Sequence, residues 1–136
     1  NREENLRLSI TTFELFKYLA TELMKKEISF ILESNFREHE LRYLEVITKE
    51  YNYQAISFVF HGEIPILHQR FMARIASATR NKVHQAVDLS DLAAFTNLIT
   101  TSREVNYFGN IYQVDATNFN FAYNDIIKFI NSLDNN

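Results

Sequence analysis

The sequence predicts an α/β domain in which helices flank a parallel sheet in three layers. Three short apolar runs, at residues 28–32, 55–60 and 110–115, have the length of strands. The first two are apolar except for one serine each, which is typical of strands buried on both faces of a parallel sheet. Segments with helical spacing separate the runs, and strands joined through helices form parallel sheets. The 136 residues suffice for a single α/β domain or for a fragment of a larger one.

The first two helices are predicted from apolar residues that recur every three or four positions. In residues 11–26 a threonine caps the start, and Lys25 and Lys26 suit the end. In residues 38–51 the apolar stripe consists of Leu41, Leu44, Ile47 and Tyr51.

The remaining helices follow the second apolar run. Pro65 favours the first turn of a helix, and its apolar stripe consists of Ile64, Leu67, Phe71 and Ile75. Asp88 or Ser90 is expected to cap a helix that extends to Leu98. Asn118 or Asn120 is expected to start a last helix, whose inward residues are Ile126, Ile127, Ile130 and Leu133.

Composition excludes several classes of protein. A net charge of −3 argues against a dedicated nucleic-acid binder, which usually presents a basic surface. No apolar stretch is long enough to span a bilayer, so no membrane role is expected. The absence of cysteine excludes disulfides and a thiol nucleophile and suits a cytoplasmic location. The four histidines have neither cysteine partners nor helical pair spacing, so no metal site is predicted.

Glu33 and Asn35 follow directly after the first apolar run. In open α/β sheets, ligands bind just beyond the carboxyl ends of the strands, so these two residues are candidates for a binding site. A carboxylate there can act as a general base or orient a hydroxyl group. The alternative is that Glu33 only caps the next helix or pairs with a cation. Asp115, which ends the third run, marks a second strand end, for which a simple turn is the competing interpretation.

Arginines gather in a segment, residues 63–87, that has the character of a lid. Arg70 and Arg74 lie one helical turn apart, and Arg80 follows in a polar, basic stretch. Guanidinium groups placed in this way can bind the oxygens of a phosphoryl group, and a flexible basic segment can close over a site. The alternative is a solvated helix face that carries ordinary ion pairs.

Three motifs together resemble a group of small bacterial P-loop kinases, with zeta-toxin-like, shikimate-type and chloramphenicol-phosphotransferase-like relatives. Residues 33–36 (ESNF) are similar to that group's E-(G/S)-N-F element, and residues 68–74 (HQRFMAR) to its R-F-x-x-R lid core. Residues 114–119 (VDATNF) resemble its last strand and the following turn. The resemblance covers nearly the whole chain and implies a P-loop NTPase-like fold.

The resemblance also implies ATP-dependent phosphoryl transfer, with magnesium, to a small molecule that carries a hydroxyl group. It implies that Glu33 acts on the acceptor, with Asn35 and Phe36 in the acceptor-binding site, and that Arg70 and Arg74 stabilise the moving phosphoryl group. Three further residues would contact the nucleotide, namely Arg80, Asp115 and Thr117.

One element of that group is absent, because no G-x-x-x-x-G-K-[ST] motif occurs in the sequence. Without it there is no cradle of backbone N–H groups for the phosphates. The resemblance therefore implies a partial fold that lacks the first strand and the phosphate loop. We expect the C-terminal substrate and lid portion of a larger kinase, inactive as it stands, which lacks an N-terminal segment or forms a homo-oligomer. The alternative is a non-catalytic module that assembles through an open sheet edge.

Overall fold

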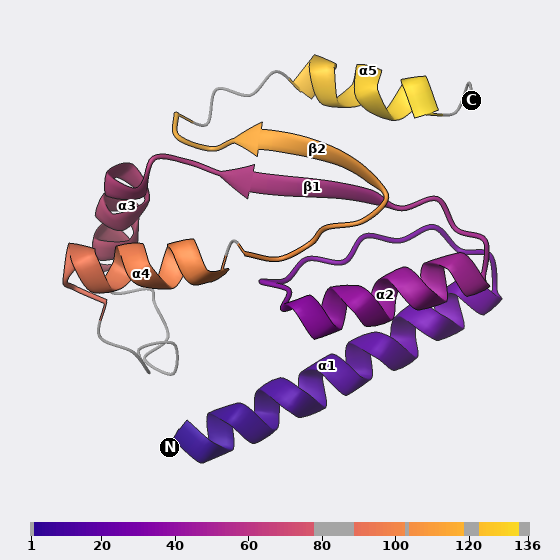
Figure 1. The fold of residues 1–136 in the computed structure, drawn as a ribbon, viewed down its shortest axis with the longest axis horizontal. Coiled ribbons are helices and arrows are strands. Elements are labelled where there is room, and N and C mark those ends of the chain that lie inside the picture. The colour runs from indigo at the N-terminus through magenta and orange to yellow at the C-terminus, as the bar shows by residue number, and fades with distance from the viewer. Residues whose placement is uncertain (1, 78–88, 103, 119–122, 134–136) are drawn as a thin grey trace. The chain divides into compact units, whose positions relative to one another are not determined.

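The computed structural model describes residues 2–77, 89–102, 104–118 and 123–133 and confirms a mixed α/β chain. The chain divides into two compact units. Unit 1 comprises Asn1–Ala55 and Val105–Gly109, and unit 2 comprises Ile56–Glu104 and Asn110–Asn136. Figure 1 shows the elements, which are α1 (Arg2–Lys25), α2 (Glu38–Glu50), β1 (Ile56–His61), α3 (Ile64–Ala76), α4 (Leu92–Ser102), β2 (Asn110–Asp115) and α5 (Tyr123–Leu133). In the described part of the chain, no helix has both the length and the hydropathy of a membrane span.

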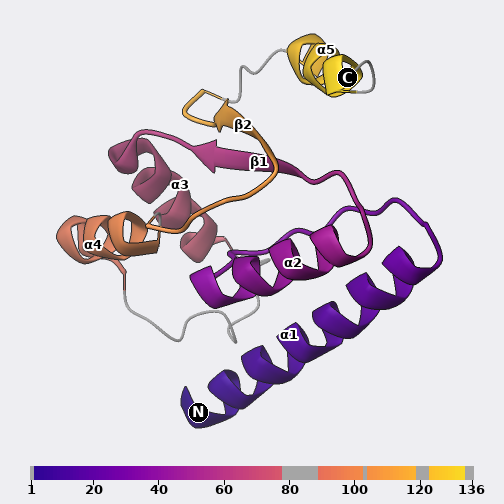
Figure 2. The same cartoon turned by 45° about the vertical axis from the view of Figure 1, so that its right-hand side comes forward.

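Unit 1 is built on two helices, α1 and α2, which lie side by side (Figure 2). Their shared core consists of Ala20 and Met24 from α1 and Leu44 and Ile47 from α2, all buried. The apolar stripe predicted for residues 38–51 is thus the face of α2 that packs inward. The buried positions follow the helical period, because Leu41, Leu44 and Ile47 are three residues apart.

Helix α1 is longer than the prediction of residues 11–26, because it begins at Arg2. An ion pair between Arg7 Nη2 and Glu3 Oε1, 2.7 Å long and one helical turn apart, supports the added turns. The helix ends in a Schellman motif, in which Glu27 adopts a left-handed φ of 56° and the N–H of Ile28 donates to the carbonyl of Leu23 at 3.0 Å.

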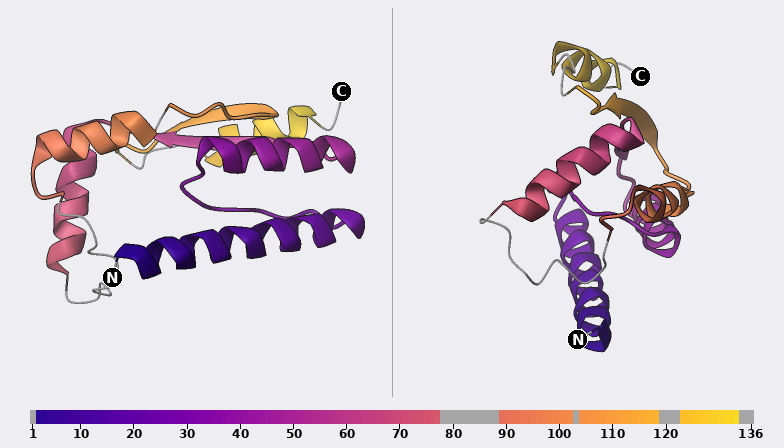
Figure 3. Two further views of the ribbon diagram at one scale, coloured as in Figure 1. Left: turned by 60° about the horizontal axis from the view of Figure 1, so that its bottom comes forward. Right: turned by 90° about the vertical axis from the view of Figure 1, so that its left-hand side faces the viewer.

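The predicted strand at residues 28–32 is wrong, because this segment pairs with no strand among the described residues. It runs back beside α1 and α2 toward the start of α2 (Figures 1 and 3). Its burial is one-sided: Phe30 and Leu32 pack against the core, whereas Ile31 is 95% exposed. A strand exists only with a hydrogen-bonded neighbour, and among the described residues the sheet contains only β1 and β2. The expected three-stranded layer is accordingly a two-stranded sheet.

Unit 2 contains that sheet, in which β1 and β2 are parallel, as predicted. Tyr112 of β2 contacts Phe58 of β1 and Phe129 of α5, with ring centroids 6.0 Å and 4.8 Å apart. Helices α3 and α4 meet around Phe95, which is 5% exposed. The sheet therefore has α5 on one of its sides, and α3 and α4 form a connection between the strands (Figure 1).

The start of α4 differs from the predicted cap at Asp88 or Ser90. The carboxylate of Asp91 accepts a hydrogen bond from the N–H of Ala94 at 2.8 Å, so Asp91 is the capping residue. Asp88 lies outside the described residues, as does Asn120, one of the two expected starts of the last helix. Helix α5 is described from Tyr123 onward. Of the residues predicted to face inward, Ile126, Ile130 and Leu133 are partly buried, whereas Ile127 is 52% exposed, so its inward position was predicted wrongly.

Candidate functional site

The carboxyl ends of β1 and β2 lie at one edge of the sheet, because the strands are parallel and His61 is in register with Asp115. The N–H of Ala116 donates to the carbonyl of His61 at 2.7 Å, which extends the pairing one residue beyond the strands. Parallel sheets bind ligands at this edge. The strand end at Asp115, predicted from the sequence, is therefore present.

Thr117 connects three parts of this edge through hydrogen bonds. Its hydroxyl accepts a hydrogen bond from the N–H of Glu63 at 3.0 Å, and its own N–H donates to Oδ1 of Asp115 at 2.8 Å. The residue is 7% exposed. The Thr117 hydroxyl and then its backbone N–H lower the pKa of Asp115, and the nearby charge of His61 lowers it further.

Gly62 allows the end of β1 to lie against Thr117. A Cβ atom at this position would lie 3.4 Å from both the amide nitrogen and the hydroxyl oxygen of Thr117, and 3.2 Å from Cδ2 of Leu67. A side chain beyond Cβ has little space between these neighbours, which favours glycine at this point.

Arg70 reaches the same edge from α3. Its guanidinium donates to the carbonyl of Ala116 at 2.5 Å and to the carbonyl of Thr117. The structure thus brings together three residues predicted for the site, Arg70, Asp115 and Thr117, although 45 or more positions separate the arginine from the other two. In this arrangement the Arg70 side chain fastens α3 to the turn after β2.

The other lid arginines have different environments. Arg74 lies one turn further along α3 with an exposed side chain. Arg80 and the second half of the predicted lid, residues 78–87, lie outside the described residues. His68 is partly buried. Its ring lies 5.0 Å from that of Phe95 in α4, and its Nε2 lies 3.1 Å from the carbonyl oxygen of Leu89, which precedes α4.

The predicted acceptor residues belong to unit 1. Glu33 and Asn35 are exposed, and Phe36 is partly buried against the core formed by α1 and α2. No strand ends at Glu33, so the strand-end argument for this carboxylate is wrong. The roles of Glu33, Asn35 and Phe36 toward an acceptor stay predictions.

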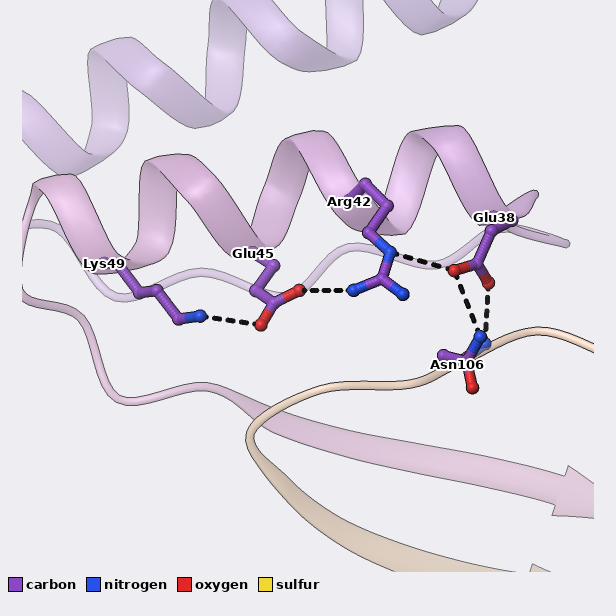
Figure 4. A network of polar contacts seen from close by, with 5 residues as sticks. All are labelled: Glu38, Arg42, Glu45, Lys49 and Asn106. Carbon is purple, nitrogen blue, oxygen red and sulfur yellow. Dashed lines mark hydrogen bonds and ion pairs between the residues drawn. The ribbon is translucent and has the colours of Figure 1, made fainter.

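A network of ion pairs along α2 was not predicted from the sequence (Figure 4). Glu38, Arg42, Glu45 and Lys49 form consecutive ion pairs of 2.7 to 3.3 Å, and Glu38 also accepts hydrogen bonds from the backbone and amide of Asn106. The Asn106 donors lower the pKa of Glu38, and Lys49 lowers that of Glu45. The signal was available as alternating charges at helical spacing. The network fastens the segment before β2 to α2 within unit 1.

The described residues do not fit a magnesium–nucleotide site by themselves. No group of three or more His, Asp or Glu side chains among them is placed to hold a metal ion. At the strand edge, the backbone N–H of Thr117 already bonds Asp115, and the Arg70 guanidinium bonds backbone carbonyls. The 136 residues contain no phosphate loop. A complete nucleotide site would therefore require groups in addition to these.

The fold is that of a mixed α/β chain with a parallel sheet. Its structure is similar to the crystal structure of a "putative kinase" from Chloroflexus aurantiacus J-10-fl, with a TM-score of 0.76. The similarity covers 97% of this chain and 72% of that chain, at 21% sequence identity. At this identity the likeness is one of fold. No protein-family model matches the chain, and no curated protein is similar to it.

Proposed function

We propose that this chain forms the substrate and lid portion of an ATP-dependent kinase for a small, hydroxyl-bearing molecule. The observation that carries the proposal is the similarity of fold to the Chloroflexus aurantiacus protein, which extends over 97% of the chain. The sequence motifs at residues 33–36, 68–74 and 114–119 support the same class of enzyme. The strand edge with Asp115, Thr117 and Arg70 lies where ligands bind in related architectures.

In the proposed reaction the chain supplies groups that bind and position, whereas the phosphate loop comes from outside its sequence. Arg74, exposed one turn beyond the anchored Arg70, would contact the transferring phosphoryl group, together with Arg80. Glu33 would act on the acceptor hydroxyl, and Asn35 and Phe36 would position the acceptor. The similarity covers 72% of the Chloroflexus aurantiacus chain, so more than a quarter of that chain has no counterpart here.

The proposal is tested with a protein extended upstream of Asn1 along its genomic reading frame, beside the 136-residue chain. Calorimetric titration with ATP and Mg²⁺ measures binding, and ADP release in the presence of a panel of small alcohols measures transfer. We expect the extended protein to bind and turn over ATP, and the 136-residue chain to show no turnover above background. ATP turnover by the 136-residue chain would contradict the prediction that this chain is inactive. An extended protein that binds no nucleotide would contradict the kinase proposal.

Arg74→Ala in the extended protein tests the role of the lid. The loss of a cation that stabilises transition-state charge costs about a hundredfold or more in kcat. Lys128→Ala is the matched control, because Lys128 is an exposed cation on α5, with 78% of its side chain exposed. Equal kcat values for the two variants would show that Arg74 does not stabilise the transferred phosphoryl group.

A second candidate function, the non-catalytic module, is favoured by the exposure of apolar side chains on the two-stranded sheet. Phe60 of β1 is 62% exposed and Ile111 of β2 is 45% exposed. Such a module would assemble through an open edge of its sheet and bind no nucleotide in any extended form. The same calorimetric titration therefore separates the two functions.

A further inference from the structure

The two arginines of α3, Arg70 and Arg74, lie one helical turn apart but have different environments. Arg70 is partly buried, and its two terminal nitrogens donate to the carbonyls of consecutive residues, Ala116 and Thr117. Arg74 is exposed, and no hydrogen bond or ion pair joins its side chain to another residue that the structure describes. The sequence motif at residues 68–74 gives both arginines the same role, whereas the structure distinguishes them.

Helix α3 is attached at two points to the turn that follows β2, residues 116–118. At the start of the helix, the N–H of Glu63 donates to the Thr117 hydroxyl at 3.0 Å. Seven residues later, Arg70 donates to carbonyls of the same turn, at 2.5 Å for Ala116. Seven residues make two turns of helix, span about 10 Å along its axis and return to nearly the same side. One attachment would leave the helix free to pivot, whereas two attachments fix the direction of its axis.

The other contacts of α3 do not replace the Arg70 link. The chain passes from β1 into α3 through two residues only, which fixes the start of the helix and leaves its far end free to pivot (Figure 1). Further along, the rings of His68 and Phe71 lie 5.0 Å and 5.3 Å from that of Phe95 in α4. These ring contacts join α3 to α4 and not to the turn after β2.

The position of Arg74 depends on this attachment. Arg74 lies four residues beyond Arg70, or about 6 Å along the axis and about 40° around it, so it belongs to the side of α3 that carries both links. That side meets the strand edge, where ligands bind in parallel sheets. A pivot of α3 would therefore displace Arg74 relative to a ligand at this edge, and a misplacement of about 1 Å can cost about a hundredfold in rate.

We propose that Arg70 is a positioning residue, which fastens α3 to the turn after β2 and thereby sets the position of Arg74 at the strand edge. The planar guanidinium suits this task, because its rigid fork of donors reaches two neighbouring carbonyls at once. Arg70 then acts through Arg74 and does not itself contact the transferred phosphoryl group. The consequence for the reaction rests on the proposed kinase function, whereas the fastening of α3 does not.

The first experiment measures the position of α3 in the 136-residue chain and requires no activity. The absence of cysteine allows nitroxide labels at two introduced cysteines, Ala73→Cys on α3 and Gln113→Cys on β2, both at exposed positions. Electron paramagnetic resonance then gives the distribution of distances between the two labels. We expect a narrow distribution in the chain that retains Arg70 and a broader one in Arg70→Met, because the substitution removes both hydrogen bonds to the turn.

Arg74→Met is the matched control, because it makes the same chemical change one helical turn away, at an exposed position. It should leave the distribution of distances unchanged. Circular dichroism checks that each variant folds. If Arg70→Met does not fold, Arg70→Gln takes its place, because the shorter amide cannot reach both carbonyls. A folded Arg70 variant with the same distribution as the parent chain overturns the proposal.

A double-mutant cycle in the extended protein tests the consequence for the reaction. We expect Arg70→Met to lower kcat and kcat/KM equally, by up to about a hundredfold, because a displaced Arg74 loses an interaction made in the transition state. Adding Arg70→Met to Arg74→Met should cause little further loss. Losses that multiply in the double variant would show that Arg70 acts directly on the reacting groups, which overturns the proposal. An extended protein without turnover contradicts the kinase proposal alone, and the label distances still decide whether Arg70 positions α3.

Discussion

The Thr117 hydroxyl provides the most direct test of how the strand edge is held. Thr117→Val keeps the shape of the side chain and removes its hydrogen bonds. The N–H of Glu63, which now donates to that hydroxyl at 3.0 Å, loses its acceptor. A hydrogen bond of this kind contributes about 1 to 2 kcal/mol at a buried site, and Thr117 is 7% exposed. The expected effect is a local loosening of the turn after β1.

Amide hydrogen exchange at Glu63, followed by NMR, is the assay. A loss of about 1 to 2 kcal/mol corresponds to a decrease in protection of about 5- to 30-fold. Thr100→Val is the control, because Thr100 is exposed on α4 and undergoes the same chemical change. Glu63 protection that is equal in both variants would refute the assigned role of the hydroxyl.

The pH dependence of stability provides a second measurement of the effect of Thr117→Val. The Thr117 hydroxyl is the largest cause of the lowered pKa of Asp115, so Thr117→Val should raise that pKa toward its ordinary value of 3.8. A lowered carboxyl pKa stabilises the folded state above the unfolded pKa, and this stabilisation is lost as the pH falls through the folded value. The difference in stability between wild type and variant should therefore be largest near neutrality and shrink in acid. An unchanged Asp115 pKa, measured by carboxyl NMR titration, would contradict the argument.

Three further predictions concern other parts of the chain. Gly109→Ala should destabilise unit 1 by about 1 to 3 kcal/mol in urea denaturation, since φ is +75° and a Cβ would lie 2.5 Å from the Ala55 carbonyl oxygen. Phe95→Ala should destabilise unit 2 by about 3 to 5 kcal/mol, because it removes a buried ring from the contact between α3 and α4. Glu38→Gln should weaken the attachment of Asn106 at neutral pH. This difference from wild type should fade as the pH falls through the lowered Glu38 pKa, which acid titration followed by NMR would show.

The sequence predicted most elements of the chain, because apolar spacing records which face of an element is buried. Strand β2 occupies the predicted residues 110–115, and α3 has Pro65 in its first turn. The first turns of α1 escaped prediction because that helix has apolar residues on two sides, which hides the one-sided period used to find its start. The strand at residues 28–32 failed for a different reason. Periodicity reports burial, and it does not report whether a hydrogen-bonding neighbour exists.

The candidate site was predictable as a set of residues but not as an arrangement. Asp115 was found because it ends an apolar run, and Thr117 was found through the resemblance of the following turn. The hydrogen bond from Arg70 to Thr117 depends on the path of the chain between the strands, which no local pattern records. Propensity alone could not select Asp91 over Asp88 or Ser90 as the helix cap, because Asp and Ser both suit that position.

The parallel pairing of β1 and β2 also governs how the chain must fold. Ile56 pairs with Asn110, 54 positions later in the sequence, so the ladder cannot start from a local turn. Closing a loop of that length costs about 3.5 kcal/mol of entropy beyond a constant term, before any pairing compensates for it. Helices α3 and α4, which lie between the strands, shorten that loop when they form early. Unit 2 should therefore fold slowly for its size, with strand pairing as its late step.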